Sequence, residues 1–172
     1  WCRYWTKRSL GGLNLDDILE KNIGIILKIS RAYARSVEDK EDLINDITLE
    51  LWKSFERFKG DSKISTWIYR VAINISMNYN RNKKTDRLDF PADLNQFENL
   101  NWINEPPDYS PAEILYQCID ELNKLNKAII LLYLDGNSHE EISEITGISK
   151  TNVGTRISRI KEQIKNLVTS KI

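Results

Sequence analysis

The chain has 172 residues, of which 41% are hydrophobic, enough for one medium or two small packed cores. Lys plus Arg equals Asp plus Glu at 25 each, so the net charge by itself indicates no partner. Two cysteines without a CxxC pair and a single histidine argue against a disulfide framework and a structural zinc site. No apolar run approaches the roughly 18 to 20 residues that cross a bilayer, so we expect a cytoplasmic protein without membrane insertion.

The first part of the chain predicts three helices. Residues 1–13 lack an initiator Met and a secretory apolar stretch, and we treat them as a leader of uncertain origin. Asn14 is a candidate cap for a first helix, and a second helix starts near Glu38. A third helix starts near Lys63 and runs uninterrupted to a basic end at residues 81–84. We group residues 14–84 as the first module.

Residues 85–110 lose helical periodicity and contain three prolines, which predicts an extended linker. Helical periodicity returns in residues 111–172, the second module. A capping box at Ser110 is expected to open one helical segment that ends near residue 135, and a second box at Ser138 opens a short helix. Gly147 makes a tight turn before a last long helix capped by Ser149. No alternating strand pattern competes, so the prediction is an all-α chain of two small helical domains.

Charge is distributed in blocks along the chain. Residues 63–84 hold five basic and no acidic side chains, a net charge of +5. Residues 85–113 hold one base and seven acids, a net charge of −6, and residues 149–172 hold six bases and one acid, a net charge of +5. One such block is as well explained by a solvated helix face. Two blocks at the ends of helical units favour a nucleic-acid partner.

The end of the chain has the outline of a helix-turn-helix, because a short helix, a turn with glycine and a basic helix follow one another. The outward side chains at the start of the last helix offer amide, hydroxyl and guanidinium groups suited to base edges and phosphates. They are Lys150, Thr151, Asn152, Thr155, Arg156 and Arg159. A three-helix packing unit that touches no DNA is the weaker alternative.

The first module carries the more specific motif. Residues 42–61 read DLINDITLELWKSFERFKGD and residues 65–74 read STWIYRVAIN. This pattern resembles conserved region two of sigma factors of the extracytoplasmic-function (ECF) group. The stretches GNSHEEI at residues 136–142 and RISR at residues 156–159 resemble region four. The resemblance covers about residues 16–84 and 113–168 and implies a promoter-specificity subunit of RNA polymerase.

The resemblance also implies roles for individual residues. The second helix would dock on core RNA polymerase through acids beside apolar groups, namely Asp42, Leu43, Asp46, Ile47, Glu50, Leu51 and Trp52. A loop and the third helix would hold melted minus-ten DNA through Lys59, Asp61, Ser62, Lys63, Thr66, Trp67, Arg70, Asn74, Asn78 and Arg81. The last helix would read the minus-35 duplex, and the acidic linker would thread through the polymerase cleft. Tyr69 is interpreted as core.

The sequence suggests three classes of function. The leading one is the ECF sigma factor, which binds core RNA polymerase and promoter DNA and needs no cofactor. The alternative is a dimeric helix-turn-helix regulator that acts without polymerase docking. An enzyme is disfavoured, because Asp42, Asp46 and Glu50 form one helix ridge without a second segment that could complete a metal site. An anti-sigma factor is a candidate further partner that the sequence leaves open.

Overall fold

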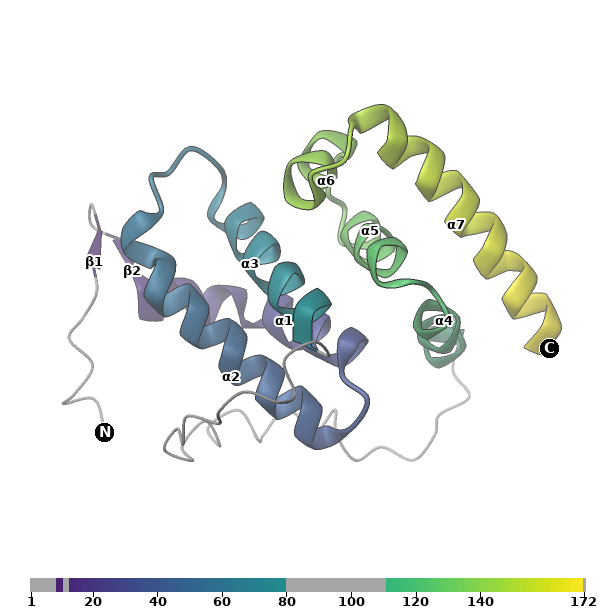
Figure 1. Cartoon of the computed structure of the whole chain (residues 1–172), viewed down its shortest axis with the longest axis horizontal. Helices are drawn as coiled ribbons and strands as arrows, with labels where there is room; N and C mark the ends of the chain where they lie inside the picture. Colours follow the sequence, from purple (N-terminus) through teal and green to yellow (C-terminus); the bar gives the residue numbers. More distant parts are fainter. Residues whose placement is uncertain (1–8, 11–12, 80–110, 172) are drawn as a thin grey trace.

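The computed structural model describes residues 9–10, 13–79 and 111–171, which form two helical units (Figure 1). The predicted linker, the Ser110 cap and Arg81 lie outside these residues. The first unit contains the helices α1 (Leu15–Tyr33), α2 (Val37–Ser54), a 3-10 helix (Phe55–Arg57) and α3 (Ile64–Asn78). The second contains α4 (Pro111–Asp120), α5 (Lys124–Leu134), α6 (His139–Thr146) and α7 (Lys150–Lys171).

The all-α prediction is confirmed, apart from one short ladder. Strands β1 (Ser9–Leu10) and β2 (Leu13–Asn14) pair antiparallel immediately before α1. Two-residue strands leave no alternating pattern for sequence reasoning to find. Within the part of the chain that the structure describes, no helix is long and apolar enough to cross a membrane.

The predicted helix starts are confirmed in the first unit. The Asn14 side chain accepts from the backbone N–H of Asp16 at 3.1 Å, as the cap of α1. Helix α2 starts one residue before its expected position, because the Ser36 hydroxyl accepts from the N–H of Asp39 at 3.1 Å. Gly60 has a φ of +77°, a left-handed conformation that ends the turn after the 3-10 helix.

The core of the first unit lies where α2 and α3 pack on α1 and on each other. Leu43, Ile47 and Leu51 are spaced four residues apart on α2 and are all 0% exposed. They face Ile26 and Ile29 of α1 and Ile68 of α3 in one apolar cluster. Each such side chain stabilises the fold by about 1.5 to 3 kcal/mol relative to exposure.

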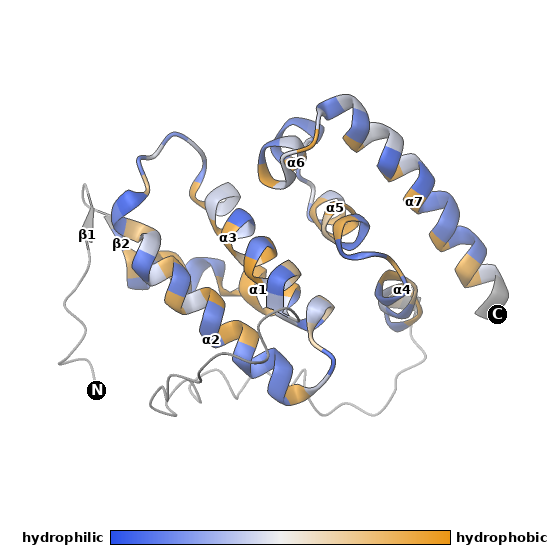
Figure 2. Cartoon of the chain, viewed as in Figure 1, coloured by the Kyte–Doolittle hydropathy of each residue, from blue (hydrophilic) through white to orange (hydrophobic). Residues whose placement is uncertain are grey.

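The second unit differs from the prediction in one place, because the expected single segment from Ser110 is two helices. Helix α4 ends at Asp120, and α5 starts after Asn123. The Asn123 side chain accepts from the N–H of Asn126 at 2.9 Å, so a new cap interrupts the apolar periodicity. Helix α7 covers this unit with Val153, Ile157 and Ile160 buried, and Figure 2 shows its hydrophilic residues facing away.

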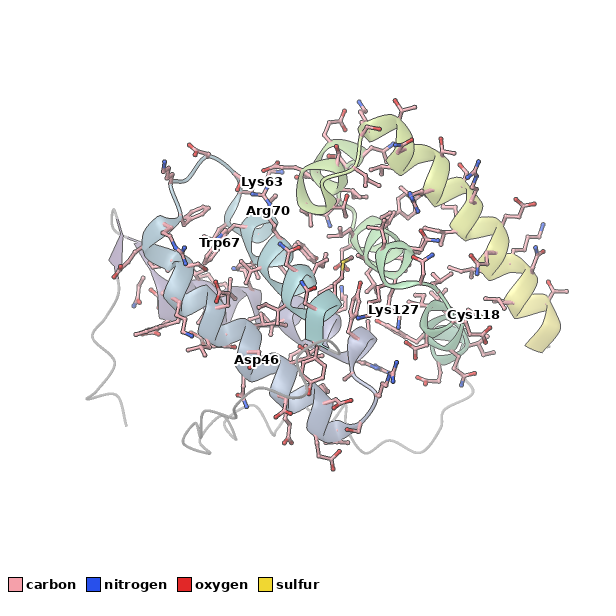
Figure 3. All side chains as sticks on the ribbon, in the orientation of Figure 1. Asp46, Lys63, Trp67, Arg70, Cys118 and Lys127 are labelled. Atoms are coloured by element: carbon pink, nitrogen blue, oxygen red, sulfur yellow. The ribbon has the colours of Figure 1, made fainter. Side chains whose placement is uncertain are left out.

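The two units contact each other through α1 and α3 on one side and α4, α5 and α6 on the other. The Tyr33 hydroxyl donates to the carbonyl of Lys124 at 2.6 Å. Lys127, labelled in Figure 3, extends from α5 and donates to the carbonyl of Ala32 at 2.7 Å. The second bond satisfies a carbonyl in the last turn of α1, and the two bonds together tie α1 to α5 in this structure.

Candidate nucleic-acid and partner interface

Helices α6 and α7 form the predicted helix-turn-helix. The Ser138 hydroxyl accepts from the N–H of Glu141 at 3.2 Å, and the Glu141 carboxylate accepts from the N–H of Ser138 at 2.8 Å, so the capping box is complete. Gly147 ends α6 with a φ of +76°, where any other residue would be strained. Helix α6 packs on the inner face of α7, where Ile142 and Ile145 of α6 and Val153 of α7 are buried. The opposite, outer face of α7 is not used in this packing.

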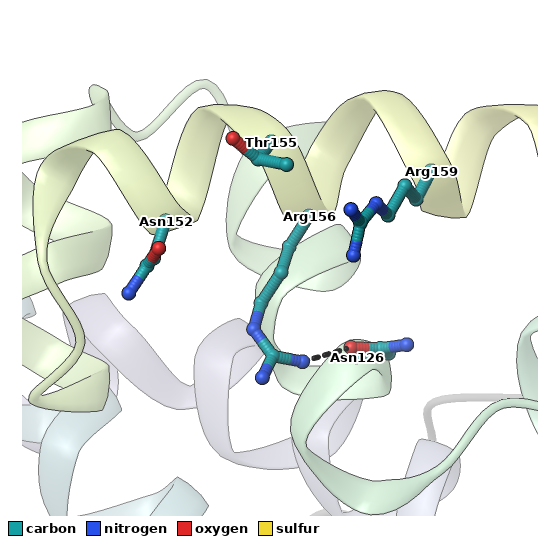
Figure 4. Close-up of a pocket in the computed structure, with 5 residues that line it drawn as sticks. All are labelled: Asn126, Asn152, Thr155, Arg156 and Arg159. Atoms are coloured by element: carbon teal, nitrogen blue, oxygen red, sulfur yellow. Dashed lines mark hydrogen bonds between the residues drawn. The ribbon is translucent and has the colours of Figure 1, made fainter.

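The six predicted residues of α7 lie on that outer face or at its edge. Thr151, Asn152, Thr155 and Arg159 are exposed, and Lys150 is exposed but ion-paired with Glu140 of α6. Arg156 is half-buried, because its side chain extends across a hollow of about 280 Å³ between α7 and the start of α5. Figure 4 shows Arg156 and Arg159 on the same side of α7, directed toward this hollow. Two guanidinium groups on one helix face suit a phosphate or a guanine edge.

The predicted minus-ten residues of the first unit fall into three classes. Lys59, Asp61, Asn74 and Asn78 are exposed. Trp67 is half-buried, with its ring centroid 5.2 Å from that of Phe58. Thr66 is 2% exposed, so the prediction that its side chain contacts DNA is corrected: it belongs to the core. The structure supports Tyr69 as core as well, with 6% exposure.

Lys63 and Arg70 already have acidic partners in the second unit (Figure 3). The Lys63 ammonium lies 2.7 Å from a carboxylate oxygen of Glu141. The Arg70 guanidinium lies 3.0 Å from a carboxylate oxygen of Glu144 and also donates to the backbone carbonyl of that residue at 3.2 Å. Two cations expected to bind single-stranded DNA are therefore paired with carboxylates of α6 in this structure, although the Lys63 side chain remains exposed.

Sequence reasoning missed a third contact between the two units, made by the carboxylate of Asp135. Asp135, at the end of α5, accepts from the Lys28 ammonium and from the Tyr69 hydroxyl, both of the first unit. Burial, and then the carboxylate of Asp135, raises the pKa of Tyr69, so this hydroxyl stays protonated as a donor. Asp135 was interpreted only as part of a helix stop. No local pattern marks a carboxylate whose partners are 107 and 66 residues away.

The predicted polymerase-binding residues of α2 divide by face. Asp42 and Asp46 are exposed, and Glu50 and Trp52 are half-buried. Leu43, Ile47 and Leu51 are 0% exposed. The prediction that these three side chains contact a partner is corrected, because the first core encloses them. An acid directly precedes each of these three apolar residues in the sequence. The sequence pattern therefore did not separate the buried face of α2 from its exposed face.

The acids on α2 repel one another. Partial burial, and then the charge of Asp42, raises the pKa of Asp46. The Tyr79 hydroxyl donates to Asp42 at 3.1 Å and to Asp39 at 3.3 Å. A basic partner helix would relieve this repulsion, which is what a docking face for a cationic surface requires.

Glu141 predicts a measurable acid dependence. The hydrogen bond from Lys63, followed by that from the Ser138 N–H, lowers the pKa of Glu141 from its ordinary 4.5 to about 2. A lowered folded-state pKa stabilises the fold above pH 4.5, and this contribution is lost as the pH falls toward 2. Glu141→Gln keeps an acceptor for the capping box but not the charge. We expect its urea midpoint to fall less than that of the wild type between pH 5 and pH 3.

The matched control for this variant is Glu162→Gln, an exposed carboxylate of α7. It should follow the wild-type pH profile. Parallel profiles for Glu141→Gln and the wild type would mean that the pair with Lys63 does not persist in solution.

Among the described residues, no group of three His, Cys, Asp or Glu side chains could hold a metal ion. Cys118 is fully buried, and His139 occupies the first turn of α6. The described residues present two cationic surfaces, one at the start of α7 and one on α3 with the loop before it. They also present one acidic surface, on α2.

Two family models match the chain, one on each helical unit. The model described as Sigma-70 region 2 matches residues 18–85, and the model described as Sigma-70, region 4 matches residues 112–164. The division between them coincides with the division between the two units of the structure.

Curated relatives and solved structures agree with these matches. The ECF RNA polymerase sigma-E factor of Escherichia coli strain K12 is 32% identical over 141 residues, which cover 76% of this chain and 74% of that protein. The protein of the same name from Haemophilus influenzae is 29% identical over 144 residues, 77% of this chain and 76% of that protein. The sigma factor RpoE of Bartonella quintana, solved in complex with the anti-sigma factor NepR, is similar in fold, with a TM-score of 0.69 at 16% identity over 90% of this chain and 96% of that chain. CnrH, solved in complex with the cytosolic domain of CnrY, has a TM-score of 0.64 at 16% identity, covering 91% and 88% of the two chains.

Proposed function

Because the chain belongs to the ECF family of RNA polymerase sigma factors, we propose a division of labour between its two units in promoter recognition. The chain binds core RNA polymerase and directs initiation at specific promoters. The observation that carries this conclusion is the presence of regions 2 and 4, in that order, on two separate helical units. The dimeric regulator finds no support in these matches.

The second unit is proposed to read the minus-35 duplex with the start of α7. Lys150, Thr151 and Asn152 occupy its first turn, and Thr155, Arg156 and Arg159 continue the same outer face. Helix-turn-helix proteins place this part of the second helix against base edges in the major groove. The two arginines supply the fork geometry that guanine accepts, and Lys150 supplies charge near the phosphates.

The first unit is proposed to capture melted minus-ten DNA along α3 and the loop before it. Exposed polar groups at Lys59, Asp61, Asn74 and Asn78 line this route, together with the half-buried Ser62. Trp67 is half-buried, with its ring tilted against those of Phe55 and Phe58, so it is proposed as a partial contact rather than an open stacking platform. Lys63 and Arg70 are paired with Glu141 and Glu144 in this structure, and phosphates would compete with these carboxylates for the two cations. Arg81 is proposed for the same surface from its sequence position.

The acids on one face of α2 are proposed as the contact with core polymerase. Asp42, Asp46 and the half-buried Glu50 form a ridge of one turn spacing, and Trp52, on another face of the same helix, is proposed as a further contact. A row of acids suits a basic partner helix. The acidic linker is proposed to follow the polymerase cleft, where its charge would mimic nucleic acid. The chain is proposed to act in the cytoplasm without bond chemistry of its own.

An anti-sigma factor is proposed as a regulator. RpoE of Bartonella quintana was solved in complex with the anti-sigma factor NepR, and CnrH was solved in complex with the cytosolic domain of CnrY. We expect an inhibitor to cover the acids of α2 or the basic face of α7, and a pull-down with charge-reversed variants of each face would show which.

Run-off transcription with purified core polymerase tests the function as a whole. Transcripts that start at defined promoters only when this chain is present are the expected result. Sequence-specific binding of DNA as a two-fold symmetric dimer, with no transcript from any member of a promoter library, would favour the regulator instead.

Asp46→Lys tests the docking face. We expect it to weaken binding to core polymerase by about tenfold or more, because a like charge would face a basic helix. Fluorescence anisotropy of the labelled chain against core polymerase measures the change. Glu20→Lys, on the exposed surface of α1, is the matched charge reversal and should bind normally. Equal affinities for both variants would remove α2 from the contact.

A further inference from the structure

The side chain of Asn126 contacts the proposed base-reading residue Arg156 (Figure 4). Arg156 Nη1 donates to Asn126 Oδ1 at 3.1 Å. A guanidinium group has only donors, so the amide oxygen and not the amide nitrogen of Asn126 must face it. The bond uses one of the five N–H donors of Arg156 and leaves the others for a base edge or a phosphate.

The backbone at each end of this bond is held in place. Asn126 lies in the first turn of α5, where its own N–H is bonded to the cap residue Asn123 at 2.9 Å. Ala128 and Ile129, two and three residues further along α5, are 0% exposed and anchor the helix in the core. On α7, Ile157 is 4% exposed directly after Arg156. The amide oxygen is therefore carried by an anchored helix, and a long, flexible side chain can be oriented against it.

The position of Arg156 differs from that of the other cations on the same face. Lys150 and Arg159 are exposed, whereas Arg156 is half-buried and spans the hollow lined by Asn126, Asn152, Thr155, Arg156 and Arg159. An arginine that is already oriented loses less conformational freedom when it binds. It also presents its donors in a restricted set of directions, which favours one base edge over another.

We propose that Asn126 is a positioning residue that orients the Arg156 guanidinium in this hollow and so sharpens base discrimination in the minus-35 element. The inference rests on the proposed role of Arg156 as a reader of the duplex. A neutral amide suits this task better than a carboxylate, because an acid would neutralise Arg156 and repel the DNA phosphates. Asn126 was not among the predicted site residues, since it precedes the helix-turn-helix and only the packing of α5 on α7 brings it there.

The test uses the wild-type holoenzyme to select a promoter from a pool with a randomised upstream element. Affinity is then measured for that promoter and for single base-pair changes in it. At the base pair where Arg156→Ala abolishes the preference, we expect Asn126→Ala to reduce the preference about threefold to tenfold. Asn126→Asp keeps the acceptor, so it should keep the preference while lowering the affinity for every sequence by a similar factor.

A double-mutant cycle completes the test. Adding Asn126→Ala to Arg156→Ala should change nothing further, whereas additive losses would overturn the proposal. Asn166→Ala, an exposed amide near the end of α7, is the matched control and should behave as wild type. If Arg156→Ala alters no base preference, the proposed role of Arg156 as a reader fails, and the positioning role of Asn126 fails with it. If it does and Asn126→Ala does not, only the positioning role fails.

Discussion

Replacing Ile47 with alanine is expected to lower the free energy of unfolding by about 2 to 5 kcal/mol. Its side chain is 0% exposed, in the row with Leu43 and Leu51 where α2 packs on the rest of the first unit. Truncation removes buried apolar contacts and leaves a cavity that rigid helices on all sides cannot fill. Urea unfolding followed by circular dichroism measures the change.

Val37→Ala is the control on the same helix. This side chain is 48% exposed, so its loss should change the free energy of unfolding by less than about 0.5 kcal/mol. The comparison also separates the two faces of α2. Asp46→Lys should impair polymerase binding at near-normal stability, whereas Ile47→Ala should lower stability. A stable Ile47→Ala variant that no longer binds polymerase would place Ile47 on the surface, against the structure.

Most helix boundaries could be predicted from short sequence patterns. Capping residues are read from a few neighbouring positions, so Asn14 and Ser138 marked the starts of α1 and α6 correctly. Asn123 was passed over because apolar residues continue on both sides of it at helical spacing, and the break between α4 and α5 was missed. A helix cap such as Asn123, placed within an apparently continuous row of apolar residues, can be recognised only in the structure, where the chain changes direction.

The candidate site was less accessible to sequence reasoning, for a different physical reason. Spacing indicates which residues share a helix face but not which face the core takes, and Leu43 and Thr66 were therefore assigned to surfaces. Contacts between the units have no local signal at all. The packing of α6 on α3 brings the carboxylate of Glu144 to Arg70. The packing of α5 on α3 brings Asp135 to Tyr69 in the same way.

Arg156→Ala is expected to weaken binding of the holoenzyme to its selected minus-35 duplex by about 1 to 3 kcal/mol, which is roughly fivefold to 150-fold. The reason is the loss of a guanidinium group that extends from α7 into the hollow beside α5, where it is oriented by Asn126. Gel-shift titration against the selected promoter measures the effect.

Two further variants separate recognition from charge. Lys165→Ala removes one positive charge from the exposed, later part of α7, so it should cost little, and equally for all sequences. Arg156→Lys keeps the charge at the site but replaces a planar fork with a single ammonium. If Arg156 reads a base edge, the lysine variant should retain much of the non-specific affinity and the salt dependence but lose the base preference. If Arg156 only neutralises a phosphate, the lysine variant should bind as the wild type does, with an unchanged preference at every base pair.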